Sequence, residues 1–317
     1  MSIEENKSKR MNYTLWVEKY RPANIEETIL PPDIKNFFEK IIEEGDLPNL
    51  LLHSSSPGSG KTTTAKALVA ELDMDYIYIN TSSEGGIDTL RDTISKFATS
   101  MSFDGKKKAV ILDEFDGATI NLQQGLRAAI EEFHESCRFI FTCNYVTKII
   151  EPLKSRCQMV DFNFTDKTTT KGMMARIGRR ILEILDAEGV EYDKKTIIKI
   201  VKTFYPDMRK MLGLLQQYSK QNGIINNDIF NYESVDEELF ELILNKKMRK
   251  AREYVIERNY NYPELYRALY DNVIPQMEQA SQGGAYITVA EYMYRDSFVI
   301  DKEINFFACL IELAGII

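Results

Sequence analysis

Short apolar runs alternate with longer amphipathic stretches along the first half of the chain. Five runs have the length and composition of buried strands, and they cover residues 49–53, 76–80, 109–112, 139–143 and 159–162. Between them, apolar residues recur at helical spacing over residues 61–72, 87–99 and 122–133. This regular alternation predicts a parallel sheet whose two faces are both covered by helices.

The pattern changes at about residue 165, beyond which no further strand is predicted. Three helices are expected next, at residues 168–188, 194–204 and 206–221. A polar connector, "NGIINNDIFNYES", then leads into a second helical block with expected breaks near Pro263, Pro275 and "QGGA". The layout predicts an α/β domain, a small helical domain and a larger all-α domain, at residues 1–165, 166–230 and 231–317.

Composition narrows the class of protein. The 317 residues carry a net charge of −8, so the chain as a whole is not a basic nucleic-acid wrapper, and DNA contact requires a local patch. The first ten residues, "MSIEENKSKR", lack the apolar core of a signal peptide, and no apolar run approaches membrane-spanning length. Four cysteines without a C-x-x-C pair and only two histidines argue against a zinc site. These features predict a reduced, cytoplasmic protein.

The stretch "LLLHSSSPGSGKTTT" has the pattern of a phosphate-binding loop between a strand and a helix. Lys61 would reach the β- and γ-phosphates, and the Thr62 hydroxyl would ligate Mg²⁺. The general pattern asks for glycine where this chain has Ser55, but Gly58 and Gly60, next to the phosphates, are present. An ordinary Ser/Gly-rich turn is the alternative. Because Lys-Thr follows a buried strand in register, we interpret the loop as a nucleotide site.

Polar residues also end two later strands. In "KAVILDEFDG", Asp113 would hold Mg²⁺ through water, and Glu114 would deprotonate the attacking water. In "FIFTCNY", Asn144 can position the γ-phosphate and the lytic water. A solvated acidic turn and an ordinary turn-forming asparagine are the alternatives. The carboxyl ends of parallel strands meet at one edge, where ligands of open α/β sheets bind.

A third polar position, in "PLKSRCQMVDF", is suited to act on another subunit. Arg156 comes just before the last strand and away from the chain's own phosphate loop. A guanidinium there can neutralise the γ-phosphate of a neighbouring subunit, while a plain surface arginine is the competing explanation.

Taken together, the motifs resemble those of a sliding-clamp loader ATPase of the AAA+ class. They are "WVEKYRP", "SPGSGKTT", "LDEFD", "TCNY", "LKSRC" and "PDMRK", in this order and spacing. The sequence is similar to the small subunits of replication factor C and closer to the ATPase subunit of T-even-type phage clamp loaders. The match is good from Trp16 to about Tyr218, and over the C-terminal block it depends mainly on helical content and length.

The resemblance implies a fold and a set of site residues. The fold would be an α/β P-loop AAA+ domain with a five-stranded parallel sheet, a helical lid domain and an all-α collar domain for oligomerisation. ATP and Mg²⁺ would be the cofactors. The adenine end would be lined by Val17, Glu18, Lys19, Tyr20 and Ile29. The phosphates would be held by Gly58, Ser59, Gly60, Lys61, Thr62 and Thr63.

Further roles follow from the same resemblance. Asn144 would be the first sensor, Arg156 the arginine finger, and Arg209 the second sensor that couples ATP to closure of the lid. For Arg209 the alternative is ordinary helix-surface charge.

The expected DNA and clamp contacts lie in and after one helix. "EGGIDTLRDTISKF" places Ile87 at a helix N-terminus that can meet a phosphate, with Arg91 one turn further on. A solvated helix face explains Arg91 equally well, and Gly86 departs from the basic residue usual in the family. Met101 and Phe103, beyond the helix, are the candidates for clamp contact.

The resemblance also implies a cycle and its partners. ATP binding would assemble a spiral of copies of this chain with a non-identical subunit, which holds the sliding clamp open around primer–template DNA. Hydrolysis would release the loaded clamp, in the host cytoplasm if the protein is phage-encoded. The alternatives are another AAA+ motor, such as a helicase loader or branch-migration ATPase, and a subunit that binds nucleotide but only builds the ring. Intact Lys61, Glu114 and Arg156 argue against the last.

Overall fold

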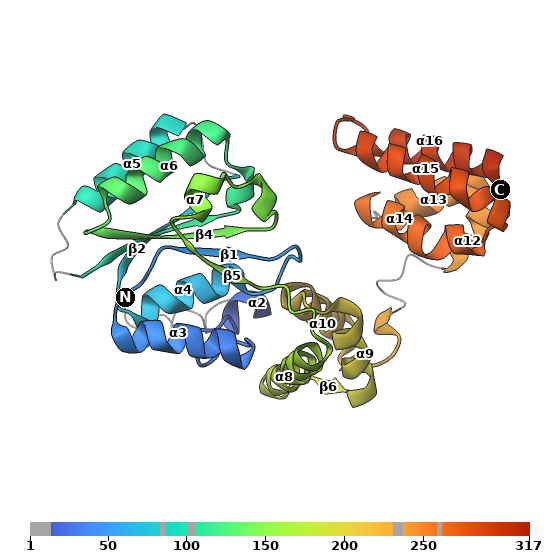
Figure 1. The fold of residues 1–317 in the computed structure, drawn as a ribbon. Helices are drawn as coiled ribbons and strands as arrows, with labels where there is room; N and C mark the ends of the chain where they lie inside the picture. Colours follow the sequence, from blue (N-terminus) through green and yellow to red (C-terminus); the bar gives the residue numbers. More distant parts are fainter. Residues whose placement is uncertain (1–13, 83–86, 101–105, 231–236, 259–261) are drawn as a thin grey trace. The chain divides into compact units, whose positions relative to one another are not determined.

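The computed structural model describes residues 14–82, 87–100, 106–230, 237–258 and 262–317 (Figure 1). They form two compact units, Met1–Asn226 and Asn227–Ile317, and each is described here by itself.

A five-stranded sheet lies at the centre of the first unit. Its strands are β1 (Leu50–His53), β2 (Asp75–Asn80), β3 (Lys108–Asp113), β4 (Cys137–Cys143) and β5 (Gln158–Asp161). They are all parallel, in the order β2-β3-β4-β1-β5, so the phosphate-loop strand β1 lies between β4 and β5. Every residue of β3 is buried, as expected for an interior strand of a sheet covered on both faces. The predicted five-stranded parallel sheet is confirmed.

Helices cover both faces of this sheet (Figure 1). Alternate β1 and β4 residues face opposite layers: Leu51 and Phe141 join one apolar cluster, and Leu50 and Ile140 join the other. The first cluster includes α5 (Ile87–Thr99), α6 (Ile120–Glu132) and α7 (Glu151–Lys154). The second includes α3 (Pro32–Glu44) and α4 (Lys61–Glu71). Shorter elements are α2 (Trp16–Lys19), η1 (Phe115–Gly117) and η2 (Val146–Lys148).

Three helices complete the first unit: α8 (Lys167–Ala187), α9 (Lys194–Phe204) and α10 (Met208–Asn222). Each begins after an aspartate whose carboxylate accepts a hydrogen bond from a backbone N–H of the first turn. The expectation of no strand beyond residue 165 is wrong, because β6 (Glu191–Tyr192) pairs in parallel with β7 (Ile224–Ile225). Two-residue strands are too short to produce a periodic pattern, and only their tertiary pairing reveals them.

The second unit is helical over its described residues. It contains α12 (Glu237–Leu244), α13 (Met248–Arg258), α14 (Tyr262–Ala268), η3 (Leu269–Val273), η4 (Ile274–Gln276), α15 (Gln279–Asp296) and α16 (Lys302–Ile316). The predicted break at "QGGA" is wrong, since these residues lie inside α15. A Cβ on Gly284 would lie in ordinary van der Waals contact with α16, 3.7 Å from Ile316 Cγ2. No helix in the described part of the chain combines the length and apolar character needed to cross a membrane.

Candidate active site

The phosphate loop between β1 and α4 has the backbone that its glycines allow. Gly58 and Gly60 have φ values of 66° and 95°, a backbone conformation that residues with a side chain rarely adopt. A Cβ on Gly58 would also lie 1.9 Å from Asp207 Oδ1, so this glycine lets the first residues of α10 approach the loop. Ser55 is not among the described non-glycine residues with positive φ; its N–H and its hydroxyl each donate to Asn163 Oδ1 at 2.8 Å. Glycine is therefore not required at position 55.

Lys61 is the first residue of α4, directly after the loop, and only 8% of its surface is exposed. Its ammonium donates to Asn144 Oδ1 at 3.1 Å, to Ser59 Oγ at 3.3 Å, and to two loop carbonyls. All four of these acceptors are neutral, and burial lowers the pKa of the Lys61 ammonium below its usual value. A buried cation held only by neutral oxygens is suited to receive an anion.

Asn144 joins two parts of the site. It follows β4, and its side-chain oxygen accepts from Lys61 while its backbone N–H donates to Asp116 Oδ1 at 3.2 Å. The neighbouring strands β4 and β1 thus bring Asn144 and the phosphate loop together at the edge expected from the sequence.

Asp113, at the end of β3, accepts hydrogen bonds from three hydroxyl groups. Thr62 Oγ1 donates to Oδ1 at 2.7 Å, Thr142 Oγ1 donates to the same oxygen, and the Tyr78 hydroxyl donates to Oδ2 at 2.6 Å. Burial opposes ionisation of this carboxyl, but the three donors keep its pKa below the ordinary value. The sequence did not indicate Tyr78 or Thr142, which come from the strands on either side of β3.

The pair Thr62 and Asp113 suits Mg²⁺, which prefers hydroxyl, carboxylate, phosphate and water oxygens. Among the residues that the structure describes, no three His, Cys, Asp or Glu side chains come together as a self-contained metal site. The donor set therefore fits an ion that takes its remaining ligands from a nucleotide and water, because Mg²⁺ is seldom held by a protein cage alone.

Glu114 follows Asp113 in the left-handed backbone region, at φ 53°. Its exposed carboxylate accepts a hydrogen bond from the Ser82 hydroxyl, and its backbone N–H donates to Thr142 Oγ1 at 3.3 Å. Ser82 Oγ is also 2.6 Å from Asn80 Oδ1, at the end of β2. At this backbone position Glu114 is exposed, whereas Asp113 beside it is buried.

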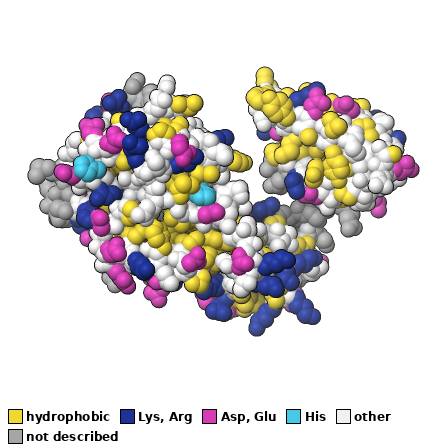
Figure 2. All heavy atoms as spheres, viewed as in Figure 1, with side chains coloured by type: hydrophobic (Ala, Val, Ile, Leu, Met, Phe, Trp, Pro, Cys, Tyr) yellow, Lys and Arg dark blue, Asp and Glu magenta, His cyan; other side chains and the backbone are white. Residues whose placement is uncertain are grey.

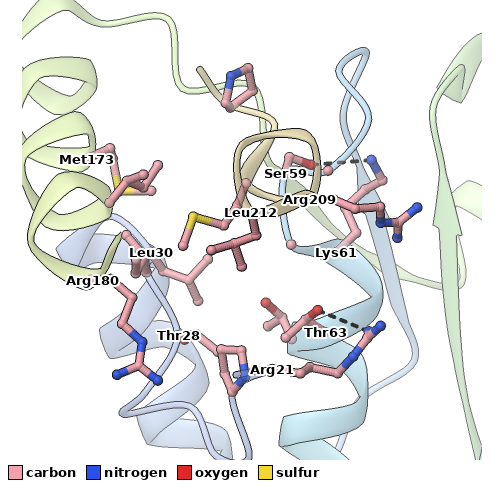
Figure 3. A pocket seen from close by; sticks show the side chains of 18 of the residues that line it. Arg21, Thr28, Leu30, Ser59, Lys61, Thr63, Met173, Arg180, Arg209 and Leu212 are labelled. Carbon is pink, nitrogen blue, oxygen red and sulfur yellow. Dashed lines mark hydrogen bonds between the residues drawn. The ribbon is translucent and has the colours of Figure 1, made fainter. Parts of the chain in front are cut away.

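A pocket extends from the phosphate loop to the helices α8 and α10 (Figure 3). Val17, Tyr20 and Ile29 line it, as do the loop residues from Gly58 to Thr63. Arg209 of α10 also lines it and lies beside Lys61 in Figure 3. Two other residues expected at the adenine end, Glu18 and Lys19, are not among the residues that line the pocket. Glu18 pairs with Arg21, and the Lys19 ammonium is 2.7 Å from Glu188 Oε1.

Several pocket residues were not predicted from the sequence. Arg21 lines the pocket and its Nη1 donates to Thr63 Oγ1 at 3.4 Å (Figure 3). It belongs to "WVEKYRP", so its motif was the signal that could have found it. Four more come from the lid helices, where nothing in the sequence marks a pocket: Met173, Ile177, Arg180 and Leu212.

Comparison with known proteins identifies the family. The family model described as ATPase family associated with various cellular activities (AAA) matches residues 51–163. The model described as sliding-clamp-loader large subunit, AAA+ ATPase lid domain, matches residues 166–231. The sliding-clamp-loader large subunit of Escherichia phage RB69 is 35% identical over 81% of this chain and 83% of its own length. The chain belongs to the sliding-clamp-loader AAA+ ATPase family.

Other relatives of this clamp-loader ATPase agree. The sliding-clamp-loader large subunit of Enterobacteria phage T4 is 35% identical over 82% of this chain and 84% of its own. The replication factor C small subunit of Saccharolobus solfataricus is 31% identical over 97% and 96%. The RuvB Holliday junction branch migration motor of Thermotoga maritima superposes with a TM-score of 0.54, covering 71% of this chain and 78% of that one, at 20% identity. That likeness shows a common fold alone, so the branch-migration alternative is not favoured.

Two further candidate residues of this clamp-loader ATPase, Arg156 and Arg91, are not among the residues that line the pocket. Arg156 follows α7, and its guanidinium pairs with the Glu131 carboxylate of α6, lowering the pKa of Glu131. Arg91 is exposed on α5. The backbone of Ile87 begins α5, but its side chain lies outside the described residues. Met101 and Phe103 lie outside them entirely.

Proposed function

We propose that this chain binds ATP with Mg²⁺ in the pocket of Figure 3 and uses ATP binding and hydrolysis to load a sliding clamp onto primer–template DNA. The observation that carries the proposal is the convergence on the phosphate loop of Asn144 from the sheet, Lys61 from α4 and Arg209 from the lid. The family, with relatives named as clamp-loader subunits, supports the choice of machine.

The roles of the phosphate-end residues follow from their chemistry. Lys61 neutralises phosphate charge in a buried position, where a cation interacts more strongly than in water. Asn144 orients the Lys61 ammonium and offers its amide to the γ-phosphate. Arg209 reaches the same phosphate from the lid, so the bound nucleotide links the lid to the sheet.

Thr62 and Asp113 would hold Mg²⁺ between the protein and the phosphates. The ion, when bound, neutralises charge that develops on the phosphate oxygens. The three hydroxyl donors keep the Asp113 carboxylate ionised and fixed in orientation. Glu114 acts as the general base that takes the proton from the attacking water, and it is the more accessible of the two carboxylates.

Arg156 acts on the ATP of an adjacent subunit. It is not among the residues that line its own pocket, and it already pairs with Glu131 on its own surface. An exposed ion pair of this kind is worth about 1 kcal/mol or less, so a neighbouring triphosphate can compete for the guanidinium. This competition would couple hydrolysis to assembly.

The proposed partners are further copies of this chain, a non-identical clamp-loader subunit, the sliding clamp and primer–template DNA. Residues 1–165 form the nucleotide-binding domain, 166–230 the lid and 231–317 the collar that holds subunits together. In the second unit, α15, the following turn and α16 expose an apolar patch, defined as Tyr294, Phe298, Ile300 and Ile304. Exposed apolar groups of this size support a protein–protein contact in the collar.

Reconstitution tests the proposal. The complex of the purified chain with its non-identical subunit should hydrolyse ATP slowly in the absence of clamp and DNA. Its rate of hydrolysis should rise strongly when clamp and primer–template DNA are both added. Lys61→Ala should lose ATP affinity by about 100-fold, because truncating a buried hydrogen-bonded cation leaves phosphate charge unpaired. Lys40→Ala, an exposed lysine on α3, is the matched control. Equal nucleotide affinity for the two variants in calorimetry would refute the site, and a lack of stimulation by clamp and DNA would refute the clamp-loading role.

A further inference from the structure

The segment Thr14–Tyr20, named here the clasp, precedes the sheet in the sequence but is hydrogen-bonded to two residues of the lid. One anchor is Gln216 of α10. Its Oε1 accepts from the Trp16 backbone N–H at 3.0 Å, and its Nε2 donates to the Thr14 carbonyl at 2.6 Å. Gln216 is 6% exposed, so both ends of a buried amide are satisfied by the clasp backbone.

The second anchor is Glu188, which ends α8. One carboxylate oxygen, Oε1, accepts from the Lys19 ammonium at 2.7 Å and from the Tyr20 hydroxyl at 2.5 Å. The Trp16 side chain also favours the ionised form of this carboxylate. Burial opposes ionisation of Glu188, but these donors keep its pKa below the usual value. The side chains of Lys19, the last residue of α2, and of Tyr20, which follows it, therefore meet at a single carboxylate of the lid.

The same segment borders the nucleotide pocket. Val17 and Tyr20 line it, and the next residue, Arg21, reaches Thr63 at the start of α4. The two anchored lid helices contribute Ile177 and Arg209 to the lining of the same pocket. A displacement of α8 or α10 from the clasp would therefore change the width of the pocket and move Arg209 relative to the phosphate loop.

From this geometry we propose that Glu188 and Gln216 are positioning residues that fasten the lid to the clasp and so hold the nucleotide pocket in its binding shape before ATP arrives. The inference rests on the proposed ATP site and adds a reason for the polar residues of "WVEKYRP": Lys19 and Tyr20 hold the lid through Glu188. Fixing both lid helices in advance removes part of the ordering cost of nucleotide binding.

The test uses the full chain and its single tryptophan, Trp16, which is 5% exposed and lies in the clasp. In the nucleotide-free protein, Glu188→Ala should shift Trp16 emission to longer wavelength and increase its quenching by acrylamide. The Kd for ATP should rise about tenfold, the effect expected when a charged hydrogen-bond acceptor is removed, while kcat at saturating ATP changes less than twofold. Glu188→Gln, which keeps an acceptor but loses the charge, should give an intermediate Kd.

Asp186→Ala is the matched control. Asp186 is near the same end of α8 and also accepts from a tyrosine hydroxyl, that of Tyr192, but it is exposed and this hydrogen bond lies within the lid. Its emission, quenching and Kd should equal those of the wild type. If Glu188→Ala behaves like Asp186→Ala, the proposal is overturned.

A double-mutant cycle separates positioning from a general loss of lid stability. Tyr20→Phe removes only a hydroxyl, and its effect on Kd should largely disappear when Glu188 is already alanine. Additive effects would show that the two groups act separately and would overturn the clasp. The Trp16 readouts need no nucleotide, so they still test the clasp if ATP binding itself is refuted. Conversely, unchanged emission with intact ATP binding would refute the clasp alone.

Discussion

The nucleotide-binding unit and the C-terminal unit place polar and apolar groups in opposite ways. In the first, charged Lys61 and Asp113 are buried beside a pocket, and each is surrounded by hydrogen-bond partners. In the second, large apolar side chains lie on the surface (Figure 2). Among the exposed apolar residues of this unit, Phe298 is 72% exposed and Ile300 fully exposed. Buried charge with satisfied partners indicates a site prepared for a charged ligand. An exposed apolar cluster indicates a surface that another protein covers.

This contrast between buried charges and exposed apolar side chains predicts which substitutions should affect ATP hydrolysis and which should affect subunit assembly. Substitutions at Lys61, Asp113 and their hydrogen-bond partners should alter nucleotide affinity or turnover without changing the association of subunits. Substitutions in the apolar patch should weaken the association of subunits without changing nucleotide affinity. Arg156 is the exception, since its proposed function requires both a bound nucleotide and an adjacent subunit.

The largest effect is expected at Arg156. Arg156→Ala should leave ATP binding to the isolated chain unchanged, while stimulated turnover of the assembled complex falls by roughly 10³–10⁵-fold, because each γ-phosphate loses its neighbour's charge. Lys154→Ala, which removes a nearby half-buried cation paired with the exposed Glu151, is the control. Steady-state phosphate release measures both. Wild-type stimulated turnover in Arg156→Ala complexes would disprove the intersubunit finger.

Glu114 should rank next. Glu114→Gln keeps the shape and the Ser82 contact but cannot accept a proton, so turnover should fall by about 10²–10⁴-fold with ATP affinity retained. Single-turnover hydrolysis and a filter-binding Kd separate the two quantities. Glu135→Gln, a similar change at an exposed carboxylate, should have no effect. Near-normal turnover in Glu114→Gln would assign the base elsewhere.

How far the site could be read from the sequence depends on the separation of the interacting residues. The loop, Asp113 and Asn144 were predictable because each directly follows an apolar strand, and parallel strands bring their ends to one edge. The pairing of Ser55 with Asn163 was not, although it explains why serine replaces glycine. These residues are 108 positions apart, and no local pattern records which side chains meet across such a distance.

The lid side of the pocket was hidden for the same reason. Periodicity located α9 at its observed bounds, Lys194–Phe204, but could not show which lid residues face the pocket. It also gave no sign that Lys19 would pair with Glu188 across 169 positions. The fold of each layer was therefore predictable, whereas the polar contacts between distant segments required the structure.

The apolar patch gives a moderate predicted effect. Phe298→Glu should weaken subunit association by about 30-fold or more, because a buried aromatic at an interface becomes a desolvated charge. Its high exposure means that the fold of the subunit should survive. Ile256→Glu, at a partly exposed position on α13 of the same unit, is the control. Sedimentation velocity measures association, and nucleotide binding by the isolated variant should equal the wild type. Unchanged association would remove the patch from the proposed collar contact.

The smallest effect concerns pH. Burial lowers the pKa of Lys61 in the free protein, and bound phosphates would raise it again because they favour the charged form. Affinity for ATP should therefore be complete below the lowered pKa and should fall as the pH rises through it, by less than tenfold per pH unit. Binding in this range should take up a proton, which calorimetry in two buffers of different ionisation enthalpy detects. Lys61→Met should bind weakly without this alkaline dependence, whereas Lys40→Met should retain it. A pH-independent affinity in the wild type would show that the Lys61 ammonium stays fully charged without nucleotide, and that neutral acceptors alone suffice to hold it.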